Sequence, residues 1–250
     1  MQLTGNTILI TGATSGIGLG LATRWHEAGN TVIVTGRRKD RLDAIAGEHD
    51  GIETLVLDVD DPASIAACAE TVAHRFPRLN VLVNNAGIMR PESLRGAGDL
   101  PIAEATVTTN LLGPIRMCEA FVPLLTGQDD PVVLNVSAAL AFVPLPAAPT
   151  ASATKAALRS YTQSLRVHLR KLGIQVIELI PPAVRTRMMG QAESEEAVPV
   201  EEFVTSLFSL IAAHPDAEEI CVDEARFLRC AEAEGRYDKT FALLSRSVRD

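Results

Sequence analysis

The chain has 250 residues, with 23 basic and 31 acidic side chains and a formal net charge of −8. This acidic balance argues against nucleic acid or an anionic membrane as the main partner, because both reward a basic surface. No uncharged apolar run approaches the ~20 residues of a membrane-spanning helix, and Met1–Gly5 lacks the charged and apolar regions of a secretory signal. We therefore expect a cytoplasmic globular protein with no membrane or nucleic-acid partner.

Short β-branched runs alternate with longer helical stretches along the whole chain. Apolar runs without polar alternation are typical of strands covered on both faces. They predict strands at 7–10, 31–34, 55–57, 81–83, 132–134 and 176–180, with a possible edge strand at 219–222. Helical patterns lie between them at 17–28, 40–48, 62–75, 102–125, 151–172 and 200–213. This order predicts one α/β domain over 1–250, with a doubly wound parallel sheet of six to seven strands of the Rossmann type.

Two features of composition bear on metals and on mobility. The four cysteines and five histidines fall in no metal-ligand spacing, so we expect no metal site and no disulfide framework. The segment 188–199 is polar and acidic and lies between a predicted strand and a predicted helix. We interpret it as a mobile lid, with an ordinary solvated surface loop as the alternative.

The first predicted strand is followed by a glycine-rich turn that opens directly into a helix. Glycine permits the tight turn and leaves no Cβ between the backbone and a pyrophosphate. The helix N-terminus then offers unpaired N–H groups to the anion. This context predicts a dinucleotide-binding turn formed by Gly12, Thr14, Ser15, Gly16, Ile17 and Gly18.

The end of the second predicted strand bears on the choice of dinucleotide. A carboxylate there would accept hydrogen bonds from the adenosine ribose and favour NAD, but the position holds Gly36. Arg37 and Arg38 follow, and both could pair with a 2′-phosphate. We therefore favour NADP over NAD as the cofactor. The alternative is a solvated turn whose arginines are partly neutralised by Asp40 and Asp43.

These features resemble the short-chain dehydrogenase/reductase family, and further motifs follow in the same order. Asp58 and Val59 look like the pair that contacts adenine, and Thr186 resembles the threonine that meets the nicotinamide carboxamide. The resemblance implies hydride transfer between NAD(P)H and a carbonyl or alcohol, in a homodimer or homotetramer. The further cofactor contacts that it implies come from Asn84, Ala86, Gly87, Lys155, Pro181 and Val184.

The resemblance fails at two positions that handle protons. The family uses a tyrosine four residues before a lysine as the general acid, and a serine thirteen residues before that tyrosine. Lys155 matches the lysine, and Asn110 matches an asparagine that helps to hold a proton-relay water. The tyrosine position, however, holds Ala151, and the serine position holds Ala138. We therefore predict a loss of about three decades or more in the activity of this chain.

No other side chain is expected to replace them. Tyr161 is rotated away from Lys155 on the same helix, Ser137 faces the opposite side of its strand, and an aliphatic hydroxyl such as that of Ser152 is a poor acid. Two explanations of the alanines stay open. The favoured one is an inactivated variant of a functional reductase, because only two side chains are altered. The other is a natural pseudoenzyme that binds a dinucleotide as a sensor or scaffold.

The substrate is only coarsely defined by the sequence. The expected pocket walls are 88–98, 139–149 and 184–199, which are largely apolar. Arg90, Arg185 and Arg187 are candidates to receive an anionic group. We expect a small to medium, partly apolar carbonyl or secondary alcohol. The helices at 102–125 and 151–172 carry apolar residues on more than one face, which is typical of a homo-oligomer.

Overall fold

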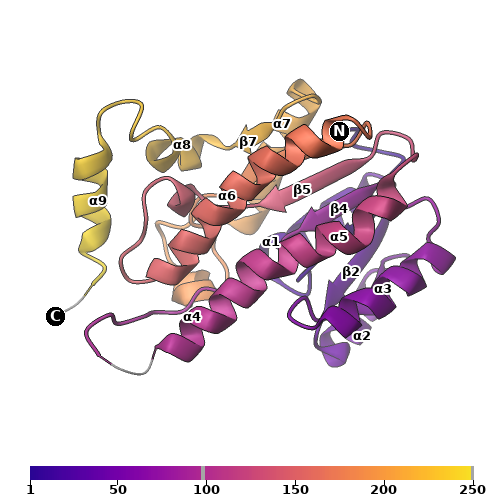
Figure 1. Cartoon of the computed structure of the whole chain (residues 1–250), viewed down its shortest axis with the longest axis horizontal. Coiled ribbons are helices and arrows are strands. Elements are labelled where there is room, and N and C mark those ends of the chain that lie inside the picture. Colours follow the sequence, from indigo (N-terminus) through magenta and orange to yellow (C-terminus); the bar gives the residue numbers. More distant parts are fainter. Residues whose placement is uncertain (97–98, 249–250) are drawn as a thin grey trace.

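The chain forms a parallel sheet of seven strands in the order β3-β2-β1-β4-β5-β6-β7, with helices on both faces (Figure 1). A computed structural model describes residues 1–96 and 99–248. The strand order reverses between β1 and β4, so the carboxyl ends of these strands open a crevice where ligands bind in such folds. The strands are β1 (Thr7–Ile10), β2 (Thr31–Gly36), β3 (Glu53–Val56), β4 (Val81–Asn84), β5 (Val132–Val136), β6 (Gln175–Ile180) and β7 (Glu219–Cys221).

The helices connect successive parallel strands. Asp61 and Pro62 start α3, since the Asp61 carboxylate accepts a hydrogen bond from the Ala63 N–H (2.9 Å). The α-helices are α1 (Gly16–Glu27), α2 (Lys39–Glu48), α3 (Pro62–Arg75), α4 (Leu100–Val107), α5 (Gly113–Leu125), α6 (Pro149–Arg170), α7 (Val200–Ala213), α8 (Asp223–Arg229) and α9 (Tyr237–Ser245). Among the residues that the structure describes, no helix is both long and apolar enough to cross a bilayer.

Two hydrophobic cores hold the helices on the sheet. On one face, α1, α2 and α7 bury Trp25, Leu42 and Phe203. On the other face, α3, α5 and α6 bury a set that includes Met117 and Phe121. The two cores bury every residue of the central strands β1, β4 and β5, so these apolar runs in the sequence correspond to strands covered from both sides, whereas the edge strand β3 is partly exposed.

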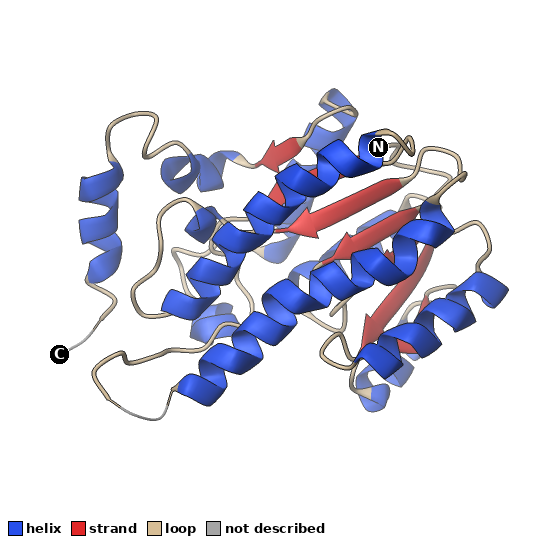
Figure 2. Cartoon of the chain, in the orientation of Figure 1, coloured by secondary structure: helices blue, strands red, loops and turns tan. Residues whose placement is uncertain are grey.

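The structure confirms the predicted seven-stranded sheet and departs from the predicted helices in two places. The single helix predicted at 102–125 is divided by a π-helical turn, η1 (Thr108–Leu112), between α4 and α5. The sequence also missed α8 and α9, which are short; α9 stands at the edge of the molecule in Figure 2. A π-helical turn frequently marks a functional site, and η1 carries Asn110.

Candidate functional site

The glycine turn packs directly on the chain that follows β4. Gly12 has φ of +63°, and a Cβ added there would lie 2.7 Å from the Ala86 Cα. A Cβ on Gly18 would lie 2.5 Å from the Asn85 Nδ2, which itself donates to the Thr11 carbonyl (2.8 Å). Side chains other than hydrogen would therefore separate the two segments, and the turn leaves a bare backbone cradle as the sequence predicts.

The N-terminus of α1 faces this cradle without a side-chain cap. Ser15 is the N-cap residue, its side chain makes no capping hydrogen bond, and it is exposed. Gly16 has φ of +58°, and a Cβ there would lie 3.1 Å from the Thr186 Cγ2. Thr186 therefore lies against the first turn of α1, beside half-buried Ile17. An uncapped helix N-terminus in a cradle of glycines fits a pyrophosphate group.

The two residues predicted to contact adenine follow the end of β3. Val59 is buried, and Asp58 accepts a hydrogen bond from the Asp60 N–H (3.1 Å) through its Oδ1. Arg37 is exposed, and its Nη1 lies 3.8 Å from the Asp60 Oδ2. The structure therefore separates the two predicted arginines, because Arg37 faces a carboxylate whereas Arg38 lines a cavity.

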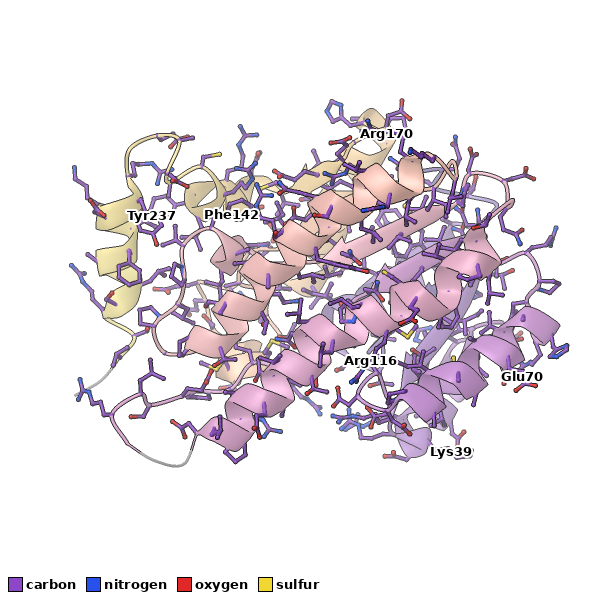
Figure 3. All side chains as sticks on the ribbon, viewed as in Figure 1. Lys39, Glu70, Arg116, Phe142, Arg170 and Tyr237 are labelled. Carbon is purple, nitrogen blue, oxygen red and sulfur yellow. The ribbon has the colours of Figure 1, made fainter. Side chains whose placement is uncertain are left out.

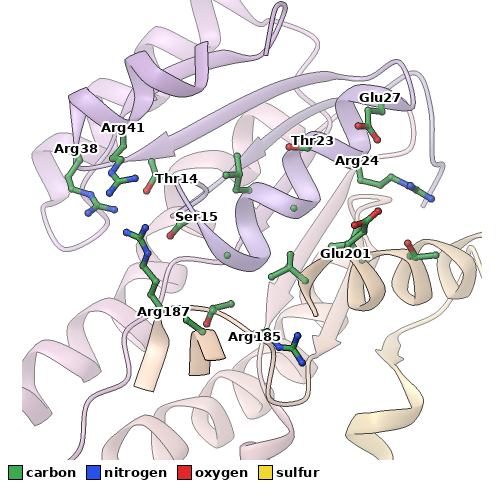
Figure 4. A pocket seen from close by; sticks show the side chains of 18 residues that line it. Thr14, Ser15, Thr23, Arg24, Glu27, Arg38, Arg41, Arg185, Arg187 and Glu201 are labelled. Atoms are coloured by element: carbon green, nitrogen blue, oxygen red, sulfur yellow. The ribbon is translucent and has the colours of Figure 1, made fainter. Parts of the chain in front are cut away.

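This cavity, of about 900 Å³, begins at the glycine turn and extends between α1 and α7 (Figure 4). Arg185 and Arg187, which the sequence places in the wall 184–199, both line this cavity. Arg41 also lines it and was missed by the sequence analysis. Its spacing was the available signal, because Arg41 follows Arg38 by three residues at the start of α2 and so shares its face. The other lining residues include Thr14 and Ser15.

Lys155 lies at the carboxyl end of β5. Its Nζ donates to the Val136 carbonyl (2.7 Å), and a Cβ on Gly87 would lie 3.7 Å from that nitrogen. Burial lowers the pKa of the Lys155 amine to about 8. Among the described residues, no carboxylate lies within 4 Å of it. The site therefore holds a buried amine next to Gly87, with no carboxylate of the described residues to compensate its charge.

We expect the Lys155→Met substitution to stabilise the fold at pH 7. The folded-state pKa lies below the usual 10.5, so the cost of burying the ammonium is fully present below pH 8 and disappears as the pH rises towards 10.5. The gain is about 1–3 kcal/mol at pH 7 and becomes small at pH 10. Thermal unfolding at both pH values measures it, with exposed Lys171→Met as the control. A gain that does not depend on pH would contradict the assigned cause.

Asn110 joins three segments at the π-helical turn. Its Oδ1 accepts from the Ile88 N–H (2.8 Å), and its Nδ2 donates to the Ile88 carbonyl (2.8 Å) and to the Thr154 Oγ1 (3.2 Å). The residue predicted to hold a relay water thus uses its side chain to fix the chain after Gly87 against α6. A Cβ on Gly87 would lie 3.3 Å from the Asn110 Oδ1, so this approach also depends on glycine.

The two alanines lie beside Lys155. Ala151 is 5% exposed and precedes the lysine by one turn of α6. Ala138 precedes the short helix η2 (Ala139–Ala141), which packs against α6, and the Ala139 N–H donates to the Pro181 carbonyl (3.0 Å). The structure therefore brings the two positions and the lysine to one site, at the end of the sheet where Asn110 also lies.

The nearby hydroxyl groups already have partners within the fold. The Ser137 Oγ donates to the Glu178 Oε1 (2.7 Å), and the Ser152 Oγ accepts from the Leu145 N–H (3.0 Å) and donates to the Ala148 carbonyl (3.1 Å). The Tyr161 phenol packs between α5 and α6, where burial raises its pKa. These three residues therefore do not offer a proton to the space beside Ala151.

Asn84 anchors the strand ends below the site. Its Nδ2 donates to the Asn135 Oδ1 (2.8 Å), and the Asn135 Nδ2 donates to the Thr162 Oγ1 on α6 (2.9 Å). This buried row crosses β4, β5 and α6 and supports the sheet, as the resemblance implies. The Asn84 Oδ1 has no hydrogen-bond partner among the described residues.

Two of the predicted substrate walls meet at the start of α6. The Glu92 carboxylate accepts from the Thr150 N–H (3.1 Å) and from the Thr150 Oγ1 (2.5 Å), which holds the chain after β4 against the segment 139–149. Residues 97–98 of the first wall lie outside the described residues. In the third wall Val184 is buried and forms an isolated bridge with Val198, so the base of the 184–199 loop is fixed.

Phe142 fixes the wall that follows Ala138. The guanidinium groups of Arg159 and Arg229 each lie 4.5 Å from the centre of its ring, and the ring lies next to α8 (Figure 3). Arg159 pairs with buried Glu178 (3.3 Å), and Arg229 pairs with Glu219 (2.7 Å). Cation–π contacts of this kind orient the ring, so α6 and α8 together position the loop after β5.

Known proteins resemble the chain over most of its length. A family model for short chain dehydrogenases matches residues 6–197. The chain is 35% identical over 247 residues to the uncharacterized oxidoreductase DltE of Bacillus subtilis, covering 96% of this chain and 97% of that protein. It is 34% identical over 194 residues to sulfoacetaldehyde reductase 2 of Chromohalobacter salexigens, covering 75% of this chain and 73% of that protein.

A solved structure agrees with this likeness. A short chain dehydrogenase from Burkholderia cenocepacia in complex with NADP is 28% identical, with a TM-score of 0.84, and covers 98% of this chain and 99% of that chain. The likeness therefore covers nearly the whole chain, both in sequence and in structure. From this agreement over nearly the full length, we conclude that the chain belongs to the short-chain dehydrogenase/reductase family.

Proposed function

We propose that the chain is an NADP(H)-dependent oxidoreductase scaffold that interconverts a carbonyl and a secondary alcohol, and that its activity as it stands is strongly impaired. This proposal rests on one observation: the glycine cradle is intact, but the site beside Lys155 lacks a side chain that can act as a general acid. Gly12, Gly16 and Gly18 keep the cradle open, whereas Ala138 and Ala151 flank Lys155 without a hydroxyl.

The cofactor fits the residues at the ends of β1, β2 and β4. The uncapped start of α1 would hold the pyrophosphate through Ser15, Gly16 and Ile17, and the chain at Ala86 and Gly87 would hold the nicotinamide ribose. Thr186, which lies against Gly16, would meet the carboxamide. When bound, the nicotinamide supplies or accepts the hydride.

The chain's own residues can bind the cofactor and the reacting oxygen, but they supply the proton poorly. Lys155 would bind a ribose hydroxyl through its amine and place positive charge near the reacting oxygen. Asn110 would hold the neighbouring backbone in position through Ile88 and Thr154. An alkoxide forms when hydride reaches a carbonyl carbon, and it needs a proton at its oxygen. With alanine at both flanking positions, that proton comes only from water or from the Lys155 ammonium.

NADP is the favoured cofactor because Gly36 ends β2 without a carboxylate and Arg38 lines the adjoining cavity. Calorimetric titration should therefore show NADPH binding at least about tenfold more tightly than NADH, which corresponds to the value of one or two charge-assisted hydrogen bonds. Tighter binding of NADH would contradict this use of the arginine.

A natural pseudoenzyme is the second candidate, and the same observation supports it. A chain that keeps the cradle but lacks the acid would bind a dinucleotide without turnover and act as a sensor or scaffold. A protein partner that co-purifies with the chain and dissociates when NADPH is added would favour this candidate over an inactivated reductase.

The substrate and the assembly follow from the same site. The walls around Ala138 and Ala151 are mainly apolar, and exposed Arg90 in the first wall could meet an anionic group. We propose a small to medium, partly apolar carbonyl or secondary alcohol as the substrate, and a cytoplasmic homodimer or homotetramer as the assembly. Sedimentation equilibrium of the purified chain tests the assembly.

A further inference from the structure

Arg187 lies at the end of the cavity that adjoins the glycine turn. It follows Thr186 in the loop after β6, and Figure 4 shows its side chain pointing past Ser15 towards Arg38 and Arg41. Arg38 and Arg41 come from the start of α2. Three guanidinium groups from two distant segments therefore converge beside the glycine turn.

The charges in the cavity are divided between its two ends. Glu27 and Glu201 line it at the end formed by α1 and α7, near Arg24 (Figure 4). At the other end, no carboxylate of the described residues lies within 4 Å of Arg38, Arg41 or Arg187. Three like charges that converge without a counter-ion repel one another. The arrangement is stabilised when an anion lies between them.

A phosphate monoester is the anion that fits this end of the cavity. Its dianion accepts several charge-assisted hydrogen bonds at once, and the planar guanidinium group suits that geometry. The end of β2 lies against the glycine turn, because a Cβ on Gly36 would lie 2.7 Å from the Thr14 Cγ2. Glycine at this position therefore lets the turn approach β2 closely, next to the start of α2 that carries Arg38 and Arg41.

We propose that Arg187 binds the 2′-phosphate of NADP(H) together with Arg38 and Arg41, and that it is therefore a further specificity-determining residue for the cofactor. This inference rests on the proposed dinucleotide binding. Through Arg187, the loop after β6 would also contact the phosphate. The Arg185 N–H donates to the Val198 carbonyl (2.7 Å), which fixes the base of the loop two residues before Arg187.

Calorimetric titration of NADPH and NADH into the unmodified chain and the Arg187→Ala variant tests the proposal. NADPH affinity should fall roughly 10- to 100-fold in the variant, while NADH affinity changes less than about twofold. The Arg24→Ala variant is the matched control, because it removes the same charge from the other end of the same cavity. It should leave both affinities unchanged.

Three results would overturn the inference. An unchanged NADPH affinity in Arg187→Ala would show that Arg187 does not contact the 2′-phosphate. Equal losses of affinity for NADPH and NADH would show that it contacts the pyrophosphate, which both cofactors share. An equal loss of NADPH affinity in Arg24→Ala would show that the effect comes from the net charge of the cavity and not from the position of Arg187. Failure of the unmodified chain to bind either cofactor would instead refute the proposed function itself.

Thermal unfolding of each variant shows whether it is folded. The Arg187→Lys variant keeps the charge but not the planar guanidinium group, so it should retain an intermediate NADPH affinity.

Discussion

The Ala138→Ser, Ala151→Tyr double variant should reduce carbonyl substrates with NADPH about 10³-fold or more faster than the unmodified chain. The tyrosine would stand one turn before Lys155 on α6, where the ammonium lowers the phenol pKa from its usual value of about 10. The phenol then donates a proton to the alkoxide, which contributes about 10²–10⁴ in rate. The serine adds an oxyanion donor worth about 10²–10³, although the two contributions do not simply multiply.

The measurement is NADPH oxidation against a panel of ketones and aldehydes. The Ala138→Ser, Ala151→Phe variant is the matched control, because it places the same ring beside Lys155 without the hydroxyl. It should show little gain over the unmodified chain. If the tyrosine variant is folded, binds NADPH and still shows no gain on any substrate of the panel, the inactivated-reductase explanation is wrong and the pseudoenzyme explanation is favoured.

Gly12→Ala should destabilise the fold and abolish NADPH binding at micromolar protein concentrations. The positive φ of +63° costs a residue with a Cβ about 1–2 kcal/mol, and the new Cβ would lie 2.7 Å from the Ala86 Cα. Overpacking against backbone adds about 1–3 kcal/mol, so we expect a loss of about 2–5 kcal/mol in the free energy of unfolding. The turn also moves away from Ala86, which displaces the backbone that would meet the pyrophosphate.

Gly47→Ala provides the control for this substitution. Gly47 lies in α2, and a Cβ added there would have no neighbour within 4 Å. Alanine in a helix interior is favoured over glycine by about 0.5–1 kcal/mol, so this variant should unfold at the same or a slightly higher temperature and bind NADPH normally. A Gly12→Ala protein as stable as Gly47→Ala would contradict the close packing of the turn.

The sequence predicted the sheet well because its strands are short apolar runs that are covered on both faces. It also predicted the glycine turn, since the pattern of strand, turn and helix is local. The π-helical turn at Asn110 was not predictable in this way, because the apolar periodicity continues through 102–125 and the extra residue is accommodated by packing against Ile88 and Thr154.

The arginines show what local sequence patterns could not predict. Arg37 and Arg38 are adjacent in sequence, yet the structure turns Arg37 to Asp60 and Arg38 to the cavity. The sequence places Arg187 in the wall 184–199, and the structure shows that it lines the cavity beside the glycine turn. Its direction depends on how Thr186 packs against Gly16, a contact between segments far apart in the chain. Sequence spacing alone contains no information about that contact.

The ring of Phe142 links the C-terminal part of the chain to the loop that follows β5. The family model ends at residue 197, whereas Arg229, which covers one side of the ring, lies beyond it on α8. Relatives that share the matched region and diverge after it would hold the equivalent loop differently. Chimeras that exchange only the last fifty or so residues between two members of the family therefore test whether this contact shapes the loop that follows β5.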